Sequence, residues 1–394
     1  KYFNLFIRKE FEMSKKILHL CSNRNVLYTN LWEKIIKHNT DLKVFHFSNK
    51  KLGMPSSGSI YDKIYINTAL PFNSFDRCFF MLKEKKILNA FRNMYRGEKF
   101  NLIHAHTLFS EGYIAYTMHK EKGIPYVVAV RNTDLNFFFK YRKHLNGSGC
   151  KILLNAEKII FLTAAYERKL FEKYIPEKYR KELKQKDIVI PNGIDDSFLQ
   201  NIAEPKNRKS IERLNIITVG VVDRNKNQLY ICKQLEKFKD RNPNIQLSYK
   251  NFGEIKDEGY AKLIEMHSFA ELCNAKPHEE LIEEYRKADV FAMLSKTESF
   301  GIVYAEAISQ ALPILYTKGE GFDNQFKDGF VGYAVDLSKK DDFIQKLEYV
   351  LDDYEGFSSR AVQGASKFDW DKIARQYCEI YDEIIRKKKK LYEI

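Results

Sequence analysis

The chain has 394 residues, of which 44% are hydrophobic, and it carries a formal net charge of +14. This length and apolar content exclude an intrinsically disordered chain and favour about two domains of ~150 residues each. No apolar stretch reaches the ~18–20 residues that cross a bilayer, so the sequence predicts no transmembrane helix.

The start of the chain does not have the pattern of a signal peptide. Residues 1–12 are charged and aromatic and lack a small-residue cleavage site. Met13 reads as a more natural start, and the sequence leaves open whether residues 1–12 are native. The six cysteines lie far apart with no C-x-x-C pair, which disfavours both a zinc site and a disulfide framework. We therefore expect a cytoplasmic protein.

The positive charge is concentrated in the first half of the chain. Residues 1–200 hold 35 Lys and Arg against 19 Asp and Glu, a net charge of +16, whereas residues 201–394 hold 31 against 33. The densest basic clusters are 83–86 and 386–390. Such asymmetry predicts an anionic partner: a membrane surface, an acidic polymer or nucleic acid. A basic residue near an anionic leaflet contributes about 1 kcal/mol, so peripheral contact with the inner face of the membrane is expected.

Short apolar runs alternate with helix-like stretches throughout the first half. The runs lie at 17–20, 42–45, 102–105, 126–130, 159–162 and 188–190. Runs of this kind are typical of strands that are covered on both faces, as in a parallel α/β sheet. A Pro191-Asn192-Gly193 turn follows the last run, and the polar residues 203–210 have the composition of a linker.

The second half repeats this pattern. Apolar runs recur at 214–220, at 245–249, near 290 and near 312, and a final helix is expected at 371–386. We predict an α/β protein with two Rossmann-like domains, residues 1–200 and 201–370, and a terminal helix in 371–394. Ligands are expected at the carboxyl ends of the strands, in the cleft that such domains form.

Residues that suit a nucleotide diphosphate cluster at two turns of the second half. A strand ending at Gly220 precedes a loop with Arg224 and Lys226, two cations that could neutralise a diphosphate without a metal. Glu298 and Glu306 flank a turn at Gly301, after which a helix is expected at 302–310. The free backbone N–H groups of residues 300–303 would form an anion site, while the carboxylates suit sugar or ribose hydroxyls. Alternatively, Glu298 caps the helix and Glu306 faces solvent.

Polar side chains also follow two strands of the first half. His104 and His106 lie on one side of their strand by alternation, with His106 nearer the strand end. Arg131, Asn132 and Asp134 follow the strand at 126–130. Polar groups at the carboxyl end of a strand indicate a substrate-facing loop. The other interpretation is a hydrogen-bonded structural histidine and a turn formed by Asn and Asp.

The segment from Glu298 to Glu306 resembles the Glu-seven-residues-Glu signature of retaining glycosyltransferases of GT-B fold, family 4 (glycosyl transferases group 1). Flanking segments at 281–290, 311–313 and 328–332 match the family as well, and the resemblance covers roughly 14–385. It implies an N-terminal acceptor domain, a C-terminal donor domain and a last helix that crosses back onto the N-terminal domain. The family's arginine directly after the glycine is Val221 here, and the loop at 21–25 lacks the glycine pair of many relatives.

The resemblance also implies roles for individual residues. Glu306 would bind the ribose of the donor and Glu298 its sugar, and His106 would contact the reacting sugar. Arg131, Asn132 and Asp134 would face the acceptor or the sugar. The diphosphate would be held by the following residues: Gly220, Arg224, Lys226, Ser299, Phe300, Gly301 and Ile302.

We therefore expect a metal-independent, retaining hexosyltransferase without a cofactor, with a UDP-sugar as the preferred donor. The acceptor is expected to be a lipid-linked or polymeric glycan of surface polysaccharide or glycolipid synthesis. One alternative is a nucleotide-sugar epimerase of similar fold, which would work without an acceptor. A basic nucleic-acid-binding protein is a further alternative, although it leaves the carboxylate pair unexplained. The sequence has no P-loop, no G-x-G-x-x-G and no H-E-x-x-H motif.

Overall fold

The computed structural model describes residues 15–392 apart from 24, 39, 53–63 and 208–211. The chain forms two compact units. Unit 1 comprises Lys1–Phe161, Lys169–Ile190 and Trp370–Ile394, and unit 2 comprises Leu162–Arg168 and Pro191–Asp369. The second unit thus begins before the boundary predicted at residue 200 and also takes up a short earlier segment. The acceptor and donor roles of the two domains stay a prediction.

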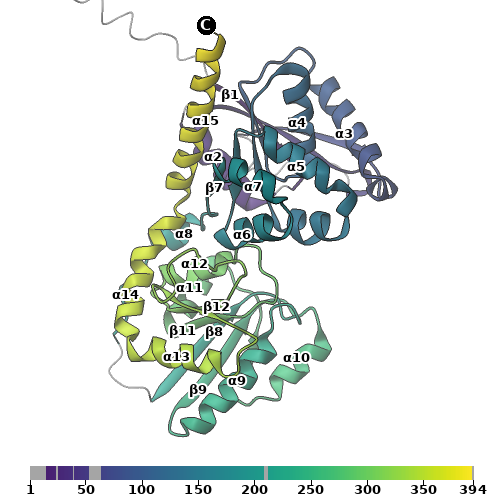
Figure 1. The fold of residues 1–394 in the computed structure, drawn as a ribbon. Helices are drawn as coiled ribbons and strands as arrows, with labels where there is room; N and C mark the ends of the chain where they lie inside the picture. Colours follow the sequence, from purple (N-terminus) through teal and green to yellow (C-terminus); the bar gives the residue numbers. More distant parts are fainter. Residues whose placement is uncertain (1–14, 24, 39, 53–63, 208–211, 393–394) are drawn as a thin grey trace, which may run out of the picture. The chain divides into compact units, whose positions relative to one another are not determined.

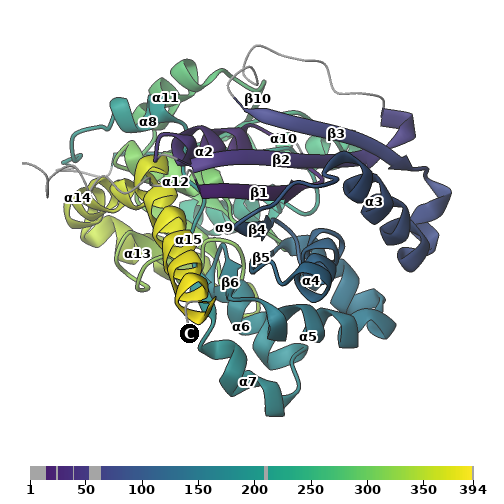
Figure 2. The same ribbon diagram turned by 90° about the horizontal axis from the view of Figure 1, so that it is seen from above.

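Unit 1 is built around a parallel sheet of seven described strands in the order β3-β2-β1-β4-β5-β6-β7; Figure 2 shows the strands from β3 to β6 in this order. The strands are β1 (Lys15–Cys21), β2 (Thr40–Asn49), β3 (Tyr65–Phe72), β4 (Leu102–Ala105), β5 (Tyr126–Val130), β6 (Lys158–Phe161) and β7 (Asp187–Val189). β1 pairs with both β2 and β4, so the strand order reverses there. In doubly wound sheets, such a reversal marks the place where ligands bind.

Helices cover both faces of this sheet. They are α2 (Val26–Ile36), α3 (Phe80–Met94), α4 (Ser110–Lys122), α5 (Asn146–Asn155), α7 (Glu177–Lys184) and α15 (Trp370–Tyr392), while α6 (Ala164–Lys173) is divided between the units at Lys169. The short segments are η1 (Lys50–Leu52), η3 (Phe75–Cys78), the π-helical η4 (Asp134–Phe139) and η5 (Lys143–Leu145). α2 starts at Val26 because the Asn25 side chain accepts the Tyr28 backbone N–H and so caps the helix.

The terminal helix α15 packs on unit 1, as the GT-B resemblance predicts. Its apolar face, including Ile373, Tyr377 and Tyr381, joins the buried cluster that contains Leu31 and Trp32 of α2. Lys34 and Asp371 form an ion pair of 2.7 Å between the two helices. Figure 1 shows α15, the last helix of the chain, beside α2.

Unit 2 contains a second parallel sheet, with six described strands in the order β10-β9-β8-β11-β12-β13. They are β8 (Arg213–Val219), β9 (Gln246–Phe252), β10 (Ala270–Cys273), β11 (Val290–Met293), β12 (Ile314–Thr317) and β13 (Gly332–Val335). The helices are α8 (Asp196–Gln200), α9 (Gln228–Arg241), α10 (Glu258–Glu265), α11 (His278–Lys287), α12 (Ile302–Ser309), α13 (Asp342–Asp352), α14 (Tyr354–Ala365) and the short η6 (Ser366–Phe368). Figure 1 shows α9 and α10 side by side along this sheet.

Two Rossmann-like parallel sheets with helices on both faces confirm the predicted α/β fold class. Every predicted strand is present. Three strands, β3, β10 and β13, were not predicted from the sequence, and all three lie at sheet edges.

Candidate functional site

The candidate site of unit 2 lies where the strand order of its sheet reverses. β8 pairs with both β9 and β11, so the loops that follow β8 and β11 leave the sheet next to each other. The first loop carries Arg224 and Lys226, and the second carries Glu298. Parallel sheets bind ligands outside the carboxyl ends of strands at such reversals, so the fold brings together the two predicted turns.

Lys226 and Glu298 form a direct ion pair. The Lys226 Nζ lies 2.6 Å from the Glu298 Oε2, and the two side chains are 19% and 13% exposed. The Glu298 Oε1 accepts the backbone N–H of Ser299 at 3.0 Å. Partial burial strengthens this pair relative to a fully solvated one, yet leaves both groups open to a ligand.

Glycines shape the turn that carries Glu298. Gly301 has φ 76° and directly precedes α12, and a Cβ there would lie 2.4 Å from the Tyr304 ring. At Gly321, whose N–H donates to the Glu298 carbonyl oxygen, a Cβ would lie 2.5 Å from the Glu298 Cγ. Both positions therefore exclude a larger residue, and the Glu298 loop is fixed between them.

The N-terminus of α12 is not capped by a side chain. No cap hydrogen bond forms at Gly301, and the first turn contains no acidic residue. Phe300 is buried in the core, which holds the turn, while Ile302 begins the helix. Backbone N–H groups at a helix start without a cap are suited to an anion. The Glu298 carboxylate accepts from the side chains of Lys226 and Ser295 and from the Ser299 N–H, all outside α12, so the alternative in which Glu298 caps this helix is wrong.

Asn225 links the two loops and was not predicted. Its side-chain N–H group donates to the Thr297 carbonyl oxygen, and its side-chain oxygen accepts the Thr297 N–H. The Asn225 carbonyl oxygen accepts the Lys296 N–H at 2.8 Å. Two of these bonds connect the residue before Lys226 to the residue before Glu298, and the third connects it to Lys296. Only its place next to Lys226 could have pointed to it from the sequence.

Glu306 is buried and does not face solvent, contrary to the alternative interpretation. It lies in the second turn of α12, and its Oε2 accepts the Tyr285 hydroxyl at 3.1 Å. Burial raises the pKa of the Glu306 carboxyl to about 7, and Asp195 raises it further, while His278 and the Tyr285 bond lower it. The carboxyl is thus poised between its two protonation states near neutral pH.

Two other residues that were predicted to bind the donor, Gly220 and Arg224, lie on the Lys226 side of the site but outside the ion pair. Gly220 directly follows β8, and its N–H donates to the Phe252 carbonyl oxygen. Arg224 lies in the same loop as Lys226, but its side chain is 68% exposed and its Nε donates to Asp257 at 3.0 Å. Arg224 is therefore not brought into the Lys226–Glu298 pair.

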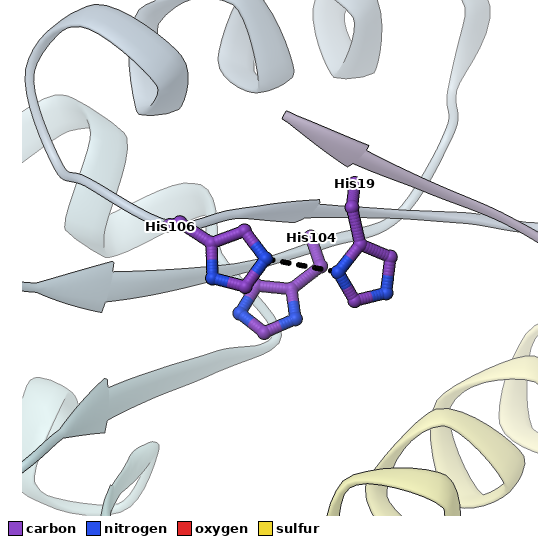
Figure 3. A group of neighbouring side chains, drawn as sticks. All are labelled: His19, His104 and His106. Atoms are coloured by element: carbon purple, nitrogen blue, oxygen red, sulfur yellow. Dashed lines mark hydrogen bonds between the residues drawn. The ribbon is translucent and has the colours of Figure 1, made fainter. Parts of the chain in front are cut away.

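In unit 1, three histidines gather at the corresponding strand reversal (Figure 3). His19 on β1 and His104 on β4 are register partners, and His106 follows β4. The His104 and His106 rings stack with centroids 4.1 Å apart, which confirms that they share one side of the strand. All three are fully buried, and burial lowers the pKa of His19 to about 3 and the pKa values of His104 and His106 well below the usual range.

These histidines are the one group among the described residues with three potential metal ligands within 4.8 Å of one another. Their arrangement does not fit an ion. An imidazole binds a metal in the plane of its ring, and the stacked His104 and His106 planes differ by only 23°. The His19 Nδ1 and His106 Nε2 are 2.9 Å apart, a hydrogen-bond distance, whereas two nitrogens on one tetrahedral ion lie about 3.3 Å apart. The cluster is a set of neutral, hydrogen-bonded rings.

The loop after β5 is organised by Asp134. Its carboxylate accepts the backbone N–H groups of Arg131, Leu108 and Phe109, so it ties this loop to the one after β4. The Arg131 Nε donates to the His106 carbonyl oxygen at 3.1 Å. The Asn132 side-chain oxygen accepts the side-chain N–H of Asn136. Asp134 therefore has the turn-forming role that was the alternative interpretation.

A buried acid next to this loop was missed by the sequence analysis. The Glu111 Oε1 accepts both the backbone N–H and the hydroxyl of Ser22, at 2.6 and 2.7 Å. Burial raises the pKa of the Glu111 carboxyl to about 7. Since this contact fixes the loop after β1, where the family's glycine pair is absent, it offers a different means of shaping that loop.

A pocket of about 570 Å³ lies elsewhere on unit 2. Arg213, Gln246 and Glu284 are among its lining residues, so it sits toward the amino ends of β8 and β9. It includes none of the predicted donor residues. Parallel sheets bind their ligands at the opposite edge, so we do not assign the site to this pocket.

Residues 200–368 match the family model of the glycosyl transferases group 1. This range contains the whole Lys226–Glu298 site and Glu306.

The similar proteins are named glycosyltransferases as well. The chain is 23% identical over 319 residues to an uncharacterized glycosyltransferase of Methanocaldococcus jannaschii, covering 76% of this chain and 80% of that protein. It is 28% identical over 184 residues to a D-inositol 3-phosphate glycosyltransferase of Corynebacterium kroppenstedtii, covering 44% and 41%. The chain thus spans less than half of that second relative.

Solved structures share the fold at low identity. A sucrose-phosphate synthase from Thermosynechococcus elongatus superposes with a TM-score of 0.71 at 15% identity, covering 94% of this chain and 99% of that one. Anabaena HepE in complex with UDP superposes with a TM-score of 0.66 at 15% identity, covering 94% and 100%. None of the described helices is both long and apolar enough to cross a membrane.

Proposed function

We propose that this protein transfers a sugar from a nucleotide diphosphate donor to an acceptor hydroxyl, with retention of configuration at the sugar. The observation that carries the proposal is the Lys226–Glu298 pair beside the uncapped start of α12, at the strand reversal of unit 2. The match of residues 200–368 to the glycosyl transferases group 1 supports it.

The pair provides the two chemistries that a sugar diphosphate needs. When the diphosphate binds, Lys226 exchanges its bond to Glu298 for phosphate oxygens, and the α12 N–H groups from Phe300 to Ile302 complete the anion site. Glu298 is then free to accept hydrogen bonds from sugar hydroxyls. Since a lysine and a helix start carry the charge of the leaving diphosphate, no metal is required. Arg224 can join only if it leaves Asp257.

Glu306 binds the ribose of the donor in this proposal. Ribose hydroxyls donate most strongly to an ionised carboxylate, and binding therefore favours loss of its proton. The Tyr285 hydroxyl, which donates to one Glu306 oxygen, leaves the other oxygen for the ligand. Gly220 gives the donor access to the end of β8.

Unit 1 contributes the acceptor side. Arg131 and Asn132 face the acceptor or the transferred sugar, and Asp134 holds their loop by accepting three backbone N–H groups. His106 contacts the reacting sugar through the neighbouring backbone or after a side-chain movement, because its ring is buried. No nucleophile of the chain is invoked: the acceptor hydroxyl attacks on the face from which the diphosphate leaves, and the leaving phosphate takes its proton.

We further infer a UDP-sugar as donor, because HepE and a pneumococcal O-GlcNAc transferase of the same fold were solved with UDP. A lipid-linked or polymeric glycan is the proposed acceptor, in surface polysaccharide or glycolipid synthesis. Contact with an anionic membrane from the cytoplasm accounts for the basic N-terminal half.

The test has two steps. First, thermal unfolding is followed with UDP, GDP, ADP, dTDP and their sugars in EDTA; a ligand at 100 times its Kd adds about 2.7 kcal/mol of stability. The stabilising nucleotide sugar is then incubated with glycan acceptors, and transfer is measured for wild type, Glu298→Ala and the exposed control Glu355→Ala. Transfer should be lost only in Glu298→Ala. Unchanged turnover in that variant contradicts the proposal, and acceptor-independent isomerisation of the sugar indicates an epimerase.

A further inference from the structure

Large apolar side chains are exposed together on unit 1, in two segments. Six residues of the segments 75–82 and 137–141 have exposed fractions between 44% and 68%: Phe75, Phe79, Met81, Leu82, Phe137 and Tyr141. We call these six residues the apolar surface. Phe75 lies in η3, Phe79 between η3 and α3, and Met81 and Leu82 at the start of α3, while the last two lie in or just after η4. Contiguous exposed apolar surface of this kind marks a binding site in a soluble unit.

The two segments are in contact. The Arg142 guanidinium donates to the carbonyl oxygens of Arg77 at 3.2 Å and of Cys78 at 3.3 Å. The rings of Phe80 and Phe138 lie 5.8 Å apart beneath the exposed residues. The Phe75 and Phe79 rings lie in a tilted arrangement with centroids 5.5 Å apart, and the Phe137 and Tyr141 rings do so at 6.3 Å. The apolar surface is therefore one patch.

Within the two segments that carry this patch, the exposed charges are all positive. Within 73–86 and 131–147 the acidic residues are Asp76, Glu84 and Asp134, and all three are buried. Asp76 pairs with Lys86 and Glu84 with Lys83. The exposed charged residues of the two segments are basic: Arg77, Lys85, Lys140 and Lys143.

We propose that the apolar surface, with these basic residues, is the site at which the protein docks on an anionic lipid bilayer. Phenylalanine, methionine and leucine side chains insert at the boundary of headgroups and acyl chains, and tyrosine suits the interface itself. The lysines and Arg77 reach the lipid phosphates with their extended side chains. A second copy of the chain fits less well, because two such patches would bring like charges together.

The position of the patch suits the proposed acceptor. η4 begins at Asp134, the residue that holds the Arg131 loop, so the candidate acceptor loop and the apolar surface are adjacent along the chain. A headgroup held at Arg131 could thus belong to a lipid anchored at Phe137. This step deepens the membrane contact of the proposed function, whereas docking itself requires no glycosyl transfer.

The test is co-sedimentation of the full chain with vesicles of phosphatidylcholine, alone or mixed with phosphatidylglycerol. We expect binding to the mixed vesicles that weakens with added salt. Phe75→Ser with Phe79→Ser should reduce partitioning at least tenfold, because two exposed aromatic rings are lost. The matched control, Leu263→Ser with Met266→Ser, removes exposed apolar side chains from α10 and the residue after it in unit 2, and should bind as wild type does.

Charge is tested in the same way. Reversal of Lys85, Lys140 and Lys143 to Glu should weaken partitioning by about a hundredfold or more, since each neutralised charge corresponds to about fivefold. The control Lys339→Glu with Lys340→Glu, both exposed in unit 2, should have a much smaller effect.

The proposal is overturned by equal losses in the patch and control variants. Equal binding to both vesicle types also contradicts it. A concentration-dependent dimer that disappears in the Phe variant would instead identify a second copy as the occupant. The vesicle assay contains no sugar nucleotide, so it reports docking alone. The UDP-induced thermal shift, recorded on each variant, reports the donor site. The two measurements therefore distinguish a failure of docking from a failure of the donor site.

Discussion

Replacing Glu306 by glutamine should have opposite effects on two properties of unit 2: its stability should increase at pH 8, while its proposed binding of UDP should weaken. In the folded protein, burial raises the pKa of this carboxyl from 4.5 to about 7. Between these values the folded state keeps the proton while the unfolded state releases it. Stability contributed by the neutral form is therefore fully present below pH 4.5 and is lost as the pH rises toward 7.

The size of the effect follows from the same two values. At 1.36 kcal/mol per pKa unit, the difference corresponds to about 3 kcal/mol of stability lost by pH 8. Glutamine cannot ionise, and its side-chain oxygen can still accept the Tyr285 hydroxyl. Glu306→Gln should thus equal wild type near pH 4.5 and exceed it by about 3 kcal/mol at pH 8. For a domain of this size the gain is about 6–12 °C in Tm.

Thermal and urea unfolding across pH 4.5–8 measure this difference directly. Glu355→Gln, an exposed substitution on α14, serves as the control and should follow wild type throughout. At the same time, Glu306→Gln should weaken UDP binding about tenfold, because an amide oxygen is a poorer acceptor than a carboxylate. A variant that gains no stability at pH 8 would refute the assigned burial effect, and unchanged UDP affinity would refute the ribose role.

Three further predictions concern the loops around the ion pair. Lys226→Ala should lower the rate of transfer by about 10²–10³, measured as acceptor-dependent UDP release, and a smaller than tenfold loss would contradict its role at the diphosphate. Asn225→Ala, which removes two side-chain bonds to Thr297, should reduce kcat more than KM; an unchanged kcat would show that the loops do not need this link. Gly301→Ala should cost more stability than Gly97→Ala, since both have positive φ but only Gly301 would meet a ring at 2.4 Å. Equal losses by urea unfolding would mean that the contact is relieved.

The strands that the sequence reveals are those buried on both faces. β5 and β11 are continuous apolar runs, and β1 is apolar from Ile17 to Cys21 apart from His19; strands covered by helices on both faces have this composition. β3 was missed because it is an edge strand of intermediate burial that contains Pro71 and polar residues. The strand β10 was not predicted for the same reason, because it is a half-exposed edge strand. β7 is also an edge strand, but the Pro-Asn-Gly turn after it made it visible.

The residues of the candidate site could be predicted one by one, but the contacts between them could not. Lys226 and Glu298 were each found from a turn at a strand end, but their contact depends on β8 and β11 being neighbours, which no local pattern specifies. The same limit applies to Arg224, whose partner Asp257 lies on a different loop.

The burial of Glu306 and His106 could not be predicted from the sequence either. Glu306 follows the pattern of a ligand-facing residue, but its raised pKa results from its burial, which the sequence of α12 alone does not reveal. His106 was predicted near the reacting sugar, and its position after β4 is as expected. The burial of its ring among His19, His104 and Trp32 could not be inferred from one strand.

Calorimetric titration of UDP and GDP into the full chain, with EDTA present, tests the donor site most directly. Wild type should bind one nucleotide clearly, Lys226→Ala should bind it at least tenfold more weakly, and the exposed control Lys339→Ala should match wild type. Absence of binding to any nucleotide by wild type, or equal affinity in Lys226→Ala, would contradict a nucleotide-sugar site at the Lys226–Glu298 pair.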